Sequence, residues 1–313
     1  MGAAFEISVI VPAYRAEETI AACLASLARQ REAPPFEVIV VDSSPDEATS
    51  RAARALARSE RGAGLDLRLE RLPERSFAGP ARNRGAALAR APRLLFLDAD
   101  CRASPGLLRA ACAALDEDGA FVGGAIGRGG PRAISARLRH LLEFKGSLPG
   151  SPPRSTWELP SACLACRREA FLRSGGYPPT RAAEDWRLHW RLWREGERLR
   201  FDPRLRVEHA TRAGWLALAR YSLVLGEASG AARRDDGLPG QAFVRHPWLA
   251  VLLPFGRTAR ALSWCARHHR GELAFLLLAW PAYLAFAAIW AWGFHRGVRG
   301  AASSGLARSG AAA

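Results

Sequence analysis

Residues 94–100 read Leu-Leu-Phe-Leu-Asp-Ala-Asp, an apolar run that ends in two carboxylates. A run of this length is typical of a buried strand in a parallel sheet. Ligands of open α/β sheets bind beyond the carboxyl ends of the strands, so Asp98 and Asp100 are predicted to lie at a binding site. Carboxylate oxygens suit Mg²⁺ or Mn²⁺, which bind substrate phosphates and keep some of their waters. Asp also serves in ordinary turns, but its position after this strand favours a metal site.

Apolar runs of the same kind lie on either side of residues 94–100, and segments with helical spacing separate them. This alternation predicts an α/β fold in which a mostly parallel sheet is flanked by helices, as in Rossmann-like nucleotide-binding halves. The predicted strands are residues 7–11, 36–41, 65–69, 94–97, 120–126 and 161–166, and residues 198–207 carry one or two further short strands. The predicted helices are residues 16–30, 46–59, 79–90, 104–115 and 183–195.

The segment between the fifth and sixth predicted strands is less regular. Residues 127–156 are rich in Gly, Pro and Arg, and this composition predicts a long connecting or substrate-facing segment. Glu184 and Asp185 open the helix at 183–195, where negative charge suits the helix dipole. A carboxylate at this place could also act as a general base, and the residues alone leave both interpretations open.

The character of the chain changes after about residue 214. Residues 215–232 have a helical pattern, residues 233–240 are a polar hinge, and residues 247–255 are apolar but too short to span a bilayer. Residues 273–294 contain no charged side chain and are long enough to cross a membrane, although a buried helix of a soluble domain would fit too. Tryptophans near the end of this run are typical of a membrane interface.

We therefore predict four regions. Residues 1–230 form the catalytic domain, 231–270 a basic hinge with interfacial helices, 271–295 a transmembrane helix and 296–313 a disordered tail. A C-terminal helical, membrane-associated region thus follows the α/β domain.

The net charge of the chain is +15, and almost all of its cations are arginines, since Lys145 is the only lysine. Such a charge favours anionic partners such as phosphate groups or acidic lipids, although compositional bias would also produce it. The positive charge is the only feature that suggests nucleic-acid binding, and no recognition motif supports such binding. We therefore predict no nucleic-acid partner. Cys163 and Cys166 form a lone pair of thiols without further zinc ligands nearby. Residues 1–6 are too short for a signal peptide, which predicts a cytoplasmic catalytic domain.

Five ordered segments resemble the motifs of family-2 glycosyltransferases. They are Ile-Ser-Val-Ile-Val-Pro-Ala-Tyr (7–14), Val-Val-Asp-Ser-Ser-Pro-Asp (40–46), Ala-Arg-Asn-Arg-Gly (81–85), Leu-Phe-Leu-Asp-Ala-Asp (95–100) and Glu-Asp-Trp (184–186). The resemblance spans roughly residues 7–210. It implies a GT-A fold, a nucleoside-diphosphate sugar donor, a divalent metal ion and inversion at the anomeric carbon.

The resemblance also assigns roles to residues. Asp185 matches the catalytic base, Asp100 a metal ligand, and Asp98 a position near both the metal and the ribose. The nucleotide-sugar residues that it implies are Pro12, Tyr14, Asp42, Arg82, Asn83 and Asp98, with Arg82 facing the diphosphate. Many relatives carry a second Asp or an Asn where this chain has Ser43, which affects only the fine contacts to the nucleoside. His209 follows a strand-like segment and is either a third metal ligand, a diphosphate contact or a structural residue.

The predicted function is metal-assisted transfer of a sugar to a hydroxyl acceptor, and two alternatives compete with it. A nucleotidyltransferase would also use acidic metal ligands, but residues 12–15 do not resemble its Gly-rich phosphate loop. A membrane-tethered nucleotide-sugar-binding protein with a decayed site conflicts with the intact Asp98, Asp100 and Asp185. The basic C-terminal region predicts a lipid-linked or membrane-proximal acceptor in cell-envelope polysaccharide synthesis, at the cytoplasmic face of the membrane.

Overall fold

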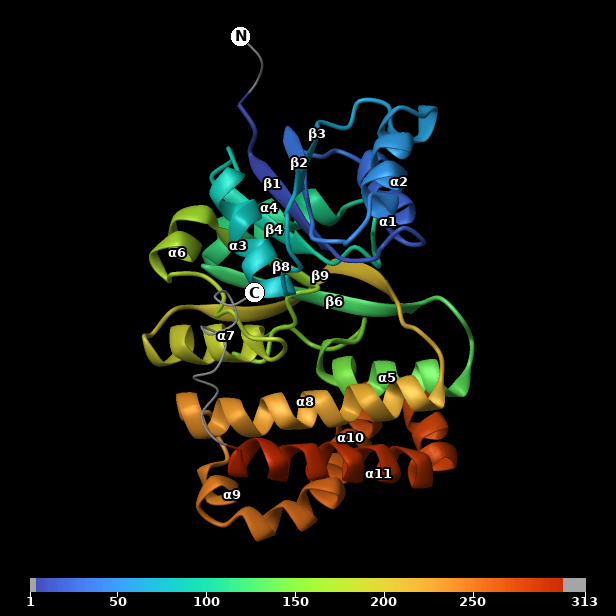
Figure 1. The fold of residues 1–313 in the computed structure, drawn as a ribbon, viewed down its shortest axis with the longest axis vertical. Coiled ribbons are helices and arrows are strands. Elements are labelled where there is room, and N and C mark those ends of the chain that lie inside the picture. The colour runs from blue at the N-terminus through green and yellow to red at the C-terminus, as the bar shows by residue number, and fades with distance from the viewer. Residues whose placement is uncertain (1–3, 301–313) are drawn as a thin grey trace, which may run out of the picture.

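The computed structural model describes residues 4–300 and consists of one mixed sheet, helices on both of its faces and a helical layer at one end (Figure 1). The sheet has nine strands in the order β3-β2-β1-β4-β8-β6-β9-β5, and β7 pairs with β9. The predicted α/β class with a flanked, mostly parallel sheet is thereby confirmed.

Four parallel strands form the N-terminal half of the sheet. They are β1 (Ile7–Ala13), β2 (Phe36–Asp42), β3 (Leu67–Arg71) and β4 (Arg93–Leu97). In the parallel register Ala13 pairs with Asp42, so the C-terminal ends of strands β1 and β2 lie side by side. Because the strands run in one direction, the residues that follow them gather at a single edge.

The second half of the sheet is mixed. Its strands are β5 (Cys101–Ala103), β6 (Phe121–Gly129), β7 (Arg154–Ser155), β8 (Cys163–Arg167) and β9 (Leu199–Ala210). β8 is antiparallel to both β4 and β6, whereas β9 is parallel to β6 and antiparallel to β5. In the β5–β9 register Cys101 pairs with His209, which brings the end of β9 beside Asp100.

Each face of the sheet has its own hydrophobic core, which lies between the sheet and the helices that cover that face. One core contains α1 (Ile20–Ala28), α2 (Ala48–Ala57) and α4 (Leu107–Asp118). The other contains α3 (Ala78–Leu88), α6 (Arg168–Arg173) and α7 (Glu184–Arg194). A Cβ on Gly85 of α3 would lie 2.4 Å from Ile10 Cγ2, so this glycine permits the close packing of α3 on β1.

The prediction of a connecting segment at residues 127–156 was wrong in part. Residues 134–144 form helix α5 (Ile134–Phe144), followed by a 3₁₀ turn at Lys145–Ser147 and then by β7. Leu138 and Leu141 of α5 are buried against α8, α10 and α11. The helix is thus stabilised by residues far along the chain, and a composition rich in Gly, Pro and Arg did not reveal it.

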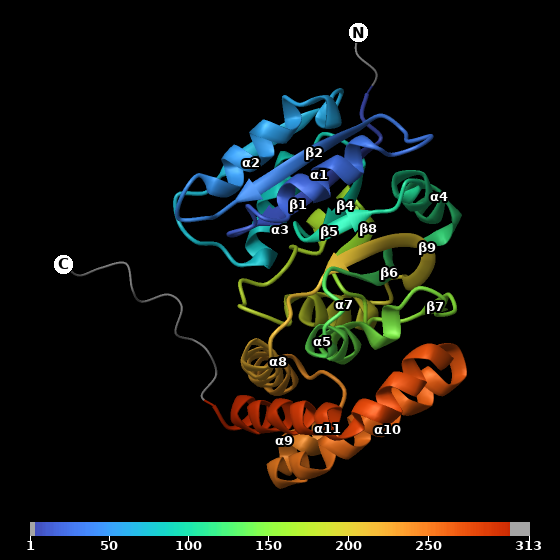
Figure 2. The same cartoon turned by 90° about the vertical axis from the view of Figure 1, so that its right-hand side faces the viewer.

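The C-terminal residues form a helical layer at the end of the molecule opposite the N-terminus (Figures 1 and 2). It contains α8 (Trp215–Asp236), α9 (Gln241–Arg245), a 3₁₀ helix (Pro247–Leu252), α10 (Leu253–His268) and α11 (Arg270–Arg299). Both views show α11 lying across the long axis of the molecule rather than along it. The predicted division at residue 230 falls within α8, α11 continues past residue 295, and residues 301–313 of the predicted tail lie outside the described residues.

Candidate active site

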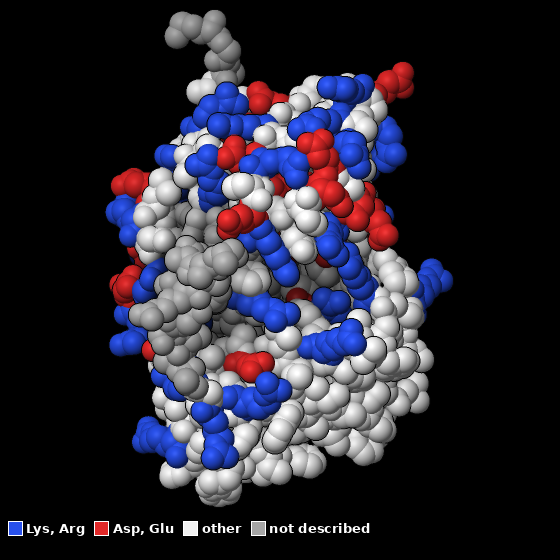
Figure 3. Space-filling model, viewed as in Figure 1, with Lys and Arg blue, Asp and Glu red and all other residues white. Residues whose placement is uncertain are grey.

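The candidate site lies where the strands β1, β2 and β4 end. Figure 2 shows the arrowhead of β2 pointing toward the face that Figure 1 presents to the viewer. The middle of that face is hollowed, and basic side chains surround the hollow (Figure 3). A cationic rim of this kind attracts anionic ligands to the edge where the predicted residues gather.

Arg82 connects the motif at residues 95–100 with the motif at residues 184–186. Its guanidinium donates to Asp98 Oδ1 at 2.6 Å and to Glu184 Oε1 at 2.9 Å, and the side chain is only 4% exposed. Burial opposes its charge, but the nearby carboxylates of Asp98 and Glu184 raise the pKa of Arg82 above the usual value. Arg82, which we predicted as a diphosphate contact, therefore holds the end of β4 against the start of α7.

Asp185 is the second residue of α7, and the residue that precedes this helix has an unusual backbone conformation. Ala183 has φ +62°, a left-handed conformation that is uncommon for a residue other than glycine. The Asp185 Oδ1 atom accepts a hydrogen bond from the Trp186 N–H at 2.8 Å. Burial and then the neighbouring charge of Glu184 raise the pKa of Asp185 to about 7. This is the pKa that a general base working near neutral pH requires.

Asp100 and His209 meet at the edge between β5 and β9. His209 Nε2 lies 3.4 Å from Asp100 Oδ1, and the Ala210 N–H donates to the Asp100 carbonyl at 2.9 Å. On its other side, His209 Nδ1 is 3.0 Å from Thr211 Oγ1, which is itself 3.3 Å from His140 Nδ1. This chain of contacts fixes the ring of His209 and aims its Nε2 atom at Asp100.

The residues at this edge fit a divalent metal ion. Asp98 and Asp100 offer carboxylate oxygens, the ligands that Mn²⁺ or Mg²⁺ prefer, and the His209 Nε2 atom lies 3.4 Å from Asp100 Oδ1. Arg82 donates to Oδ1 of Asp98, and within residues 4–300 the other carboxylate oxygen of Asp98 accepts no hydrogen bond. The Asp100 side chain is 38% exposed. Residues 4–300 do not bring three such ligands close enough together to form a complete metal cluster, so substrate phosphates and water would supply the other ligands.

The carboxylate of Asp42 accepts hydrogen bonds from its own turn. The carboxylate is fully buried at the end of β2, Oδ1 accepts from the Ser44 N–H at 2.9 Å, and Oδ2 accepts from the Ser50 hydroxyl. Both oxygens thus stabilise the turn that connects β2 to α2. Its role in the nucleoside pocket stays a prediction, and Ser43, whose hydroxyl donates to Ser76 O, lies in the same turn.

Tyr14 and Pro12 line the end of β1. The guanidinium of Arg75 lies 4.5 Å from the centre of the Tyr14 ring, a cation–π contact that connects this strand to the loop before α3. Pro12 pairs with Val41 in the β1–β2 ladder. Both residues therefore lie at the predicted nucleoside end of the sheet, and Arg75 is a neighbour that the motif comparison did not identify.

Asn83 supports the site from outside it. Its side-chain amide donates to Tyr177 O at 2.8 Å and its oxygen accepts from the Tyr177 N–H at 2.9 Å. The Tyr177 hydroxyl is in turn 2.8 Å from Ser161 Oγ. Asn83 consequently holds the loop before α7 against α3, and a direct contact with the nucleotide stays a prediction.

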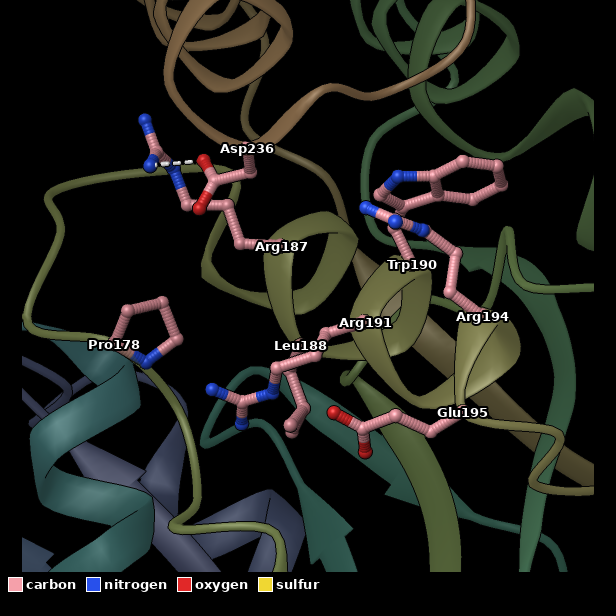
Figure 4. Close-up of a pocket in the computed structure, with 8 residues that line it drawn as sticks. All are labelled: Pro178, Arg187, Leu188, Trp190, Arg191, Arg194, Glu195 and Asp236. Carbon is pink, nitrogen blue, oxygen red and sulfur yellow. Dashed lines mark hydrogen bonds and ion pairs between the residues drawn. The ribbon is translucent and has the colours of Figure 1, made fainter.

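A separate pocket lies on the flank of α7 (Figure 4). It is lined by Pro178, Arg187, Leu188, Trp190, Arg191, Arg194, Glu195 and Asp236. Arg187 forms ion pairs with Asp235 and Asp236 of α8. These contacts connect the catalytic half of the molecule to the C-terminal layer, and the pocket contains none of the predicted site residues.

The sheet order and the grouping of Asp98, Asp100 and Asp185 at one edge define a protein of the GT-A fold. The chain belongs to glycosyl transferase family 2, whose characteristic domain matches residues 8–174. Family membership confirms the resemblance found in the sequence and favours glycosyl transfer over nucleotidyl transfer.

Curated relatives carry the same activity in their names. The chain is 30% identical over 172 residues to the pre-mycofactocin glycosyltransferase of Mycobacterium tuberculosis, covering 50% of this chain and 35% of the relative. It is 39% identical over 93 residues to the amylovoran biosynthesis glycosyltransferase AmsB of Erwinia amylovora, covering 30% of each. The chain thus spans about a third of the length of these curated relatives.

Solved structures share the fold over nearly the whole chain. The mannosyltransferase PcManGT from Pyrobaculum calidifontis, in complex with GDP-Man and Mn²⁺, has a TM-score of 0.63 at 24% identity, with 94% of this chain and 88% of that chain covered. TarS 1–349 of S. aureus, in complex with UDP-GlcNAc, has a TM-score of 0.52 at 18% identity, with 94% and 90% covered.

Proposed function

We propose that this protein transfers a sugar from a nucleoside diphosphate to a hydroxyl group with inversion at the anomeric carbon. The observation that carries the proposal is the Arg82 bridge, which holds Asp98 and Glu184 in one ion-paired unit. A donor bound at Asp98 and Asp100 would then lie next to Asp185, whose raised pKa suits proton removal. The complexes of two fold neighbours with GDP-Man and UDP-GlcNAc support a nucleotide sugar as donor.

In this reaction the acceptor hydroxyl loses its proton to the Asp185 carboxylate. The acceptor oxygen forms a bond to the anomeric carbon as the bond from that carbon to the diphosphate breaks, and the diphosphate leaves with the electron pair. Asp98, Asp100 and His209 would hold a divalent ion, which supplies charge stabilisation for the leaving diphosphate. Arg82 keeps the Asp98 carboxylate in place, and Pro12, Tyr14 and Asp42 border the nucleoside.

We further propose that the C-terminal layer rests on a membrane and brings the domain to a lipid-linked or membrane-proximal glycan. Among residues 4–300 one helix, α11, is long and apolar enough to cross a bilayer. In its most apolar stretch of 18 residues, 28% of the residues are buried inside the protein. Its packing along α8, which carries charged side chains, favours a helix that lies in the membrane surface. All six cysteines are free thiols, which supports a reducing compartment at the cytoplasmic face.

The test is binding and turnover with a panel of nucleoside diphosphates and their sugar conjugates, with and without Mn²⁺. We expect one nucleotide to raise the melting temperature in a metal-dependent way, and Asp100→Ala to abolish that rise. Asp116→Ala, which removes a carboxylate ion-paired to Arg93 away from the site, is the matched control. A folded protein that none of the nucleotides stabilises would contradict the proposal and favour a decayed site.

A further inference from the structure

A cluster of cations lies between the catalytic domain and the C-terminal layer, outside the candidate active site. We call it the junction cluster and define it as Lys145, Arg154, Arg257 and Arg260, with Glu158 as its acidic member. Arg260 pairs with Glu158 at 2.6 Å, and Arg154 donates to the carbonyl of Gly146 at 2.6 Å while lying 5.0 Å from the centre of the Trp264 ring. These contacts connect α10 with the turn after α5 and the loop after β7.

Two cations of the junction cluster lack a counterion. The Lys145 ammonium has no hydrogen bond or ion pair with any residue in the range 4–300, although the residue is partly buried. The side chain of Arg257 makes no hydrogen bond or ion pair within that range either, and its guanidinium lies over the Trp290 ring at 3.9 Å. Four cations therefore face a single carboxylate, an arrangement that costs free energy unless an anion offsets the charge.

Three buried donors in the same place are also unpaired. Arg257 Nε, Trp264 Nε1 and Tyr283 Oη have no hydrogen-bond partner among the described residues, and Tyr283 is fully buried. Buried polar groups nearly always have a partner, so three unpaired donors beside excess positive charge indicate a missing acceptor. An anion with several oxygens would satisfy donors that point at it from different elements.

The titration of Lys145 agrees with this geometry. Burial and then the positive charges of Arg257 and Arg260 lower the pKa of the Lys145 ammonium to about 7. Arg233 of α8 responds to the same charges, since burial and then Arg257 lower its pKa to about 10. A bound anion would reverse this effect and keep Lys145 protonated at neutral pH.

We propose that the junction cluster binds a phosphate or diphosphate group at a site separate from the donor site. The ligand chemistry is that of phosphate oxygens held by Lys145, Arg154, Arg257 and Arg260. The group is carried either by a lipid headgroup or by a soluble phosphate. Exposed Trp248 and Phe255 lie on the same stretch of helices as Arg257, where the chain of a lipid could pack. The site does not depend on the proposed transfer reaction.

The single lysine makes the test specific. The full-length protein is treated with limiting acetic anhydride near neutral pH, and acetylation of the peptide that contains Lys145 is followed by mass spectrometry. The probes are inorganic pyrophosphate without metal and vesicles of phosphatidylcholine with or without phosphatidic acid. We expect fast acetylation of the free protein and protection by a phosphate-bearing probe, because a bound anion covers the amine and raises its pKa.

Variants decide whether the cluster provides the protection. Arg260→Gln and Arg257→Gln each remove a hydrogen-bond donor. Each should raise the probe concentration needed to protect Lys145 by about tenfold, as expected for the loss of one charge-assisted hydrogen bond. Arg267→Gln is the matched control, since Arg267 lies on the same helix and, among residues 4–300, its side chain forms hydrogen bonds with Ser263 alone. Arg260 is 67% exposed, so its variant should fold even where Arg257→Gln does not.

Protection by pyrophosphate assigns a soluble phosphate, and protection only by vesicles with phosphatidic acid assigns a lipid headgroup. Acetylation that neither probe slows, or protection that Arg260→Gln and Arg267→Gln leave equally strong, would overturn the site. Because these readouts need no sugar donor and no turnover, they are independent of the nucleotide panel that tests the proposed function.

Discussion

Asp185 and Arg82 together set the chemistry that we propose for the site. Burial raises the pKa of Asp185, and the Arg82 guanidinium counteracts part of that rise. A carboxylate that is too acidic would bind a proton poorly, and one that is too basic would be protonated at neutral pH. The Arg82 guanidinium therefore affects the reaction through the pKa of Asp185, although Arg82 need not touch the substrate.

Replacement of Arg82 by Gln should shift the acid limb of the pH–rate profile to higher pH. Loss of the positive charge removes an interaction that favours ionised Asp185, so more of the base is protonated at neutral pH. Steady-state rates measured across pH provide the check, and Arg82→Lys should restore part of the original profile. A lower rate with an unmoved acid limb would mean that Arg82 has only a structural role.

Asp185→Asn should make the protein more stable than wild type, by an amount that grows as pH rises. The folded-state pKa of Asp185, about 7, lies above the ordinary value of 3.8. The stability that protonation of Asp185 contributes is therefore fully present below pH 3.8 and is lost as the pH rises through about 7. The gain at high pH has an upper limit of about 4 kcal/mol, from about 1.4 kcal/mol per pKa unit.

Chemical denaturation of both proteins at several pH values between 4 and 8 measures this difference. Turnover by Asp185→Asn should be nearly abolished over the same range. A constant stability difference across pH would show that Asp185 is ionised throughout, with an ordinary pKa.

At the scale of elements, the contact between α8 and α11 depends on four glycines. A Cβ on Gly226 or Gly230 of α8 would lie 2.0 and 2.3 Å from Trp290 O and Phe294 O of α11. A Cβ on Gly293 or Gly297 of α11 would lie 2.2 and 2.0 Å from carbonyl oxygens of α8. Each helix thus has glycines four residues apart, a spacing that allows two backbones to touch.

Gly230→Leu should separate α11 from α8 and expose the C-terminal layer. Backbone atoms cannot move aside as a flexible side chain can, so the helices must part and lose the contacts of the apolar side chains around them. Limited proteolysis should then cleave within residues 237–300 faster than in wild type. Gly271→Ala is the control, because a Cβ there meets no atom within 4 Å and replaces a helical glycine. Equal cleavage of the two variants would contradict this account.

At the scale of the whole molecule, the C-terminal layer exposes large apolar side chains on its outer surface. We call this surface the apolar end face, defined by Trp248, Val251, Leu252, Phe255, Leu277, Leu278, Trp280 and Trp292, all of which are at least 49% exposed. Much of the lower right of the molecule carries no charged side chain (Figure 3). Patches of apolar surface bordered by arginines are typical of proteins that rest on anionic membranes.

Vesicle flotation checks this arrangement. We expect wild-type protein to bind vesicles that contain anionic lipid, less strongly at high salt because the arginine contacts are screened. Trp248→Ser with Phe255→Ser should weaken binding, since each aromatic ring loses about 2 kcal/mol of burial in lipid. Leu172→Ser, at an exposed leucine of α6 in the catalytic half, is the control. Flotation that the double variant leaves unchanged would rule out the apolar end face as the contact.

The sequence by itself determined the sheet and the residues at its edge, because both depend on short local patterns. Apolar runs of four to seven residues that end in Asp42 and Asp98 predict buried parallel strands, and parallel strands bring their ends together whatever follows. Asp185 was singled out by the resemblance to family-2 glycosyltransferases, since the residues alone leave open whether it is a base or a helix-start charge. The Gly- and Pro-rich composition of residues 127–156, by contrast, concealed α5, whose stability comes from α8, α10 and α11.

Only the tertiary structure decided how these residues are paired. Arg82 lies 102 residues before Glu184, and Lys145 lies more than 100 residues before Arg257, so no local pattern can state that either pair shares a site. The same holds for the hydrogen bonds that Asp42 already accepts and for His209, whose ring is oriented through Thr211. Local periodicity fixes which residues face a core, whereas the charge balance around a side chain is a sum over elements that folding alone brings together.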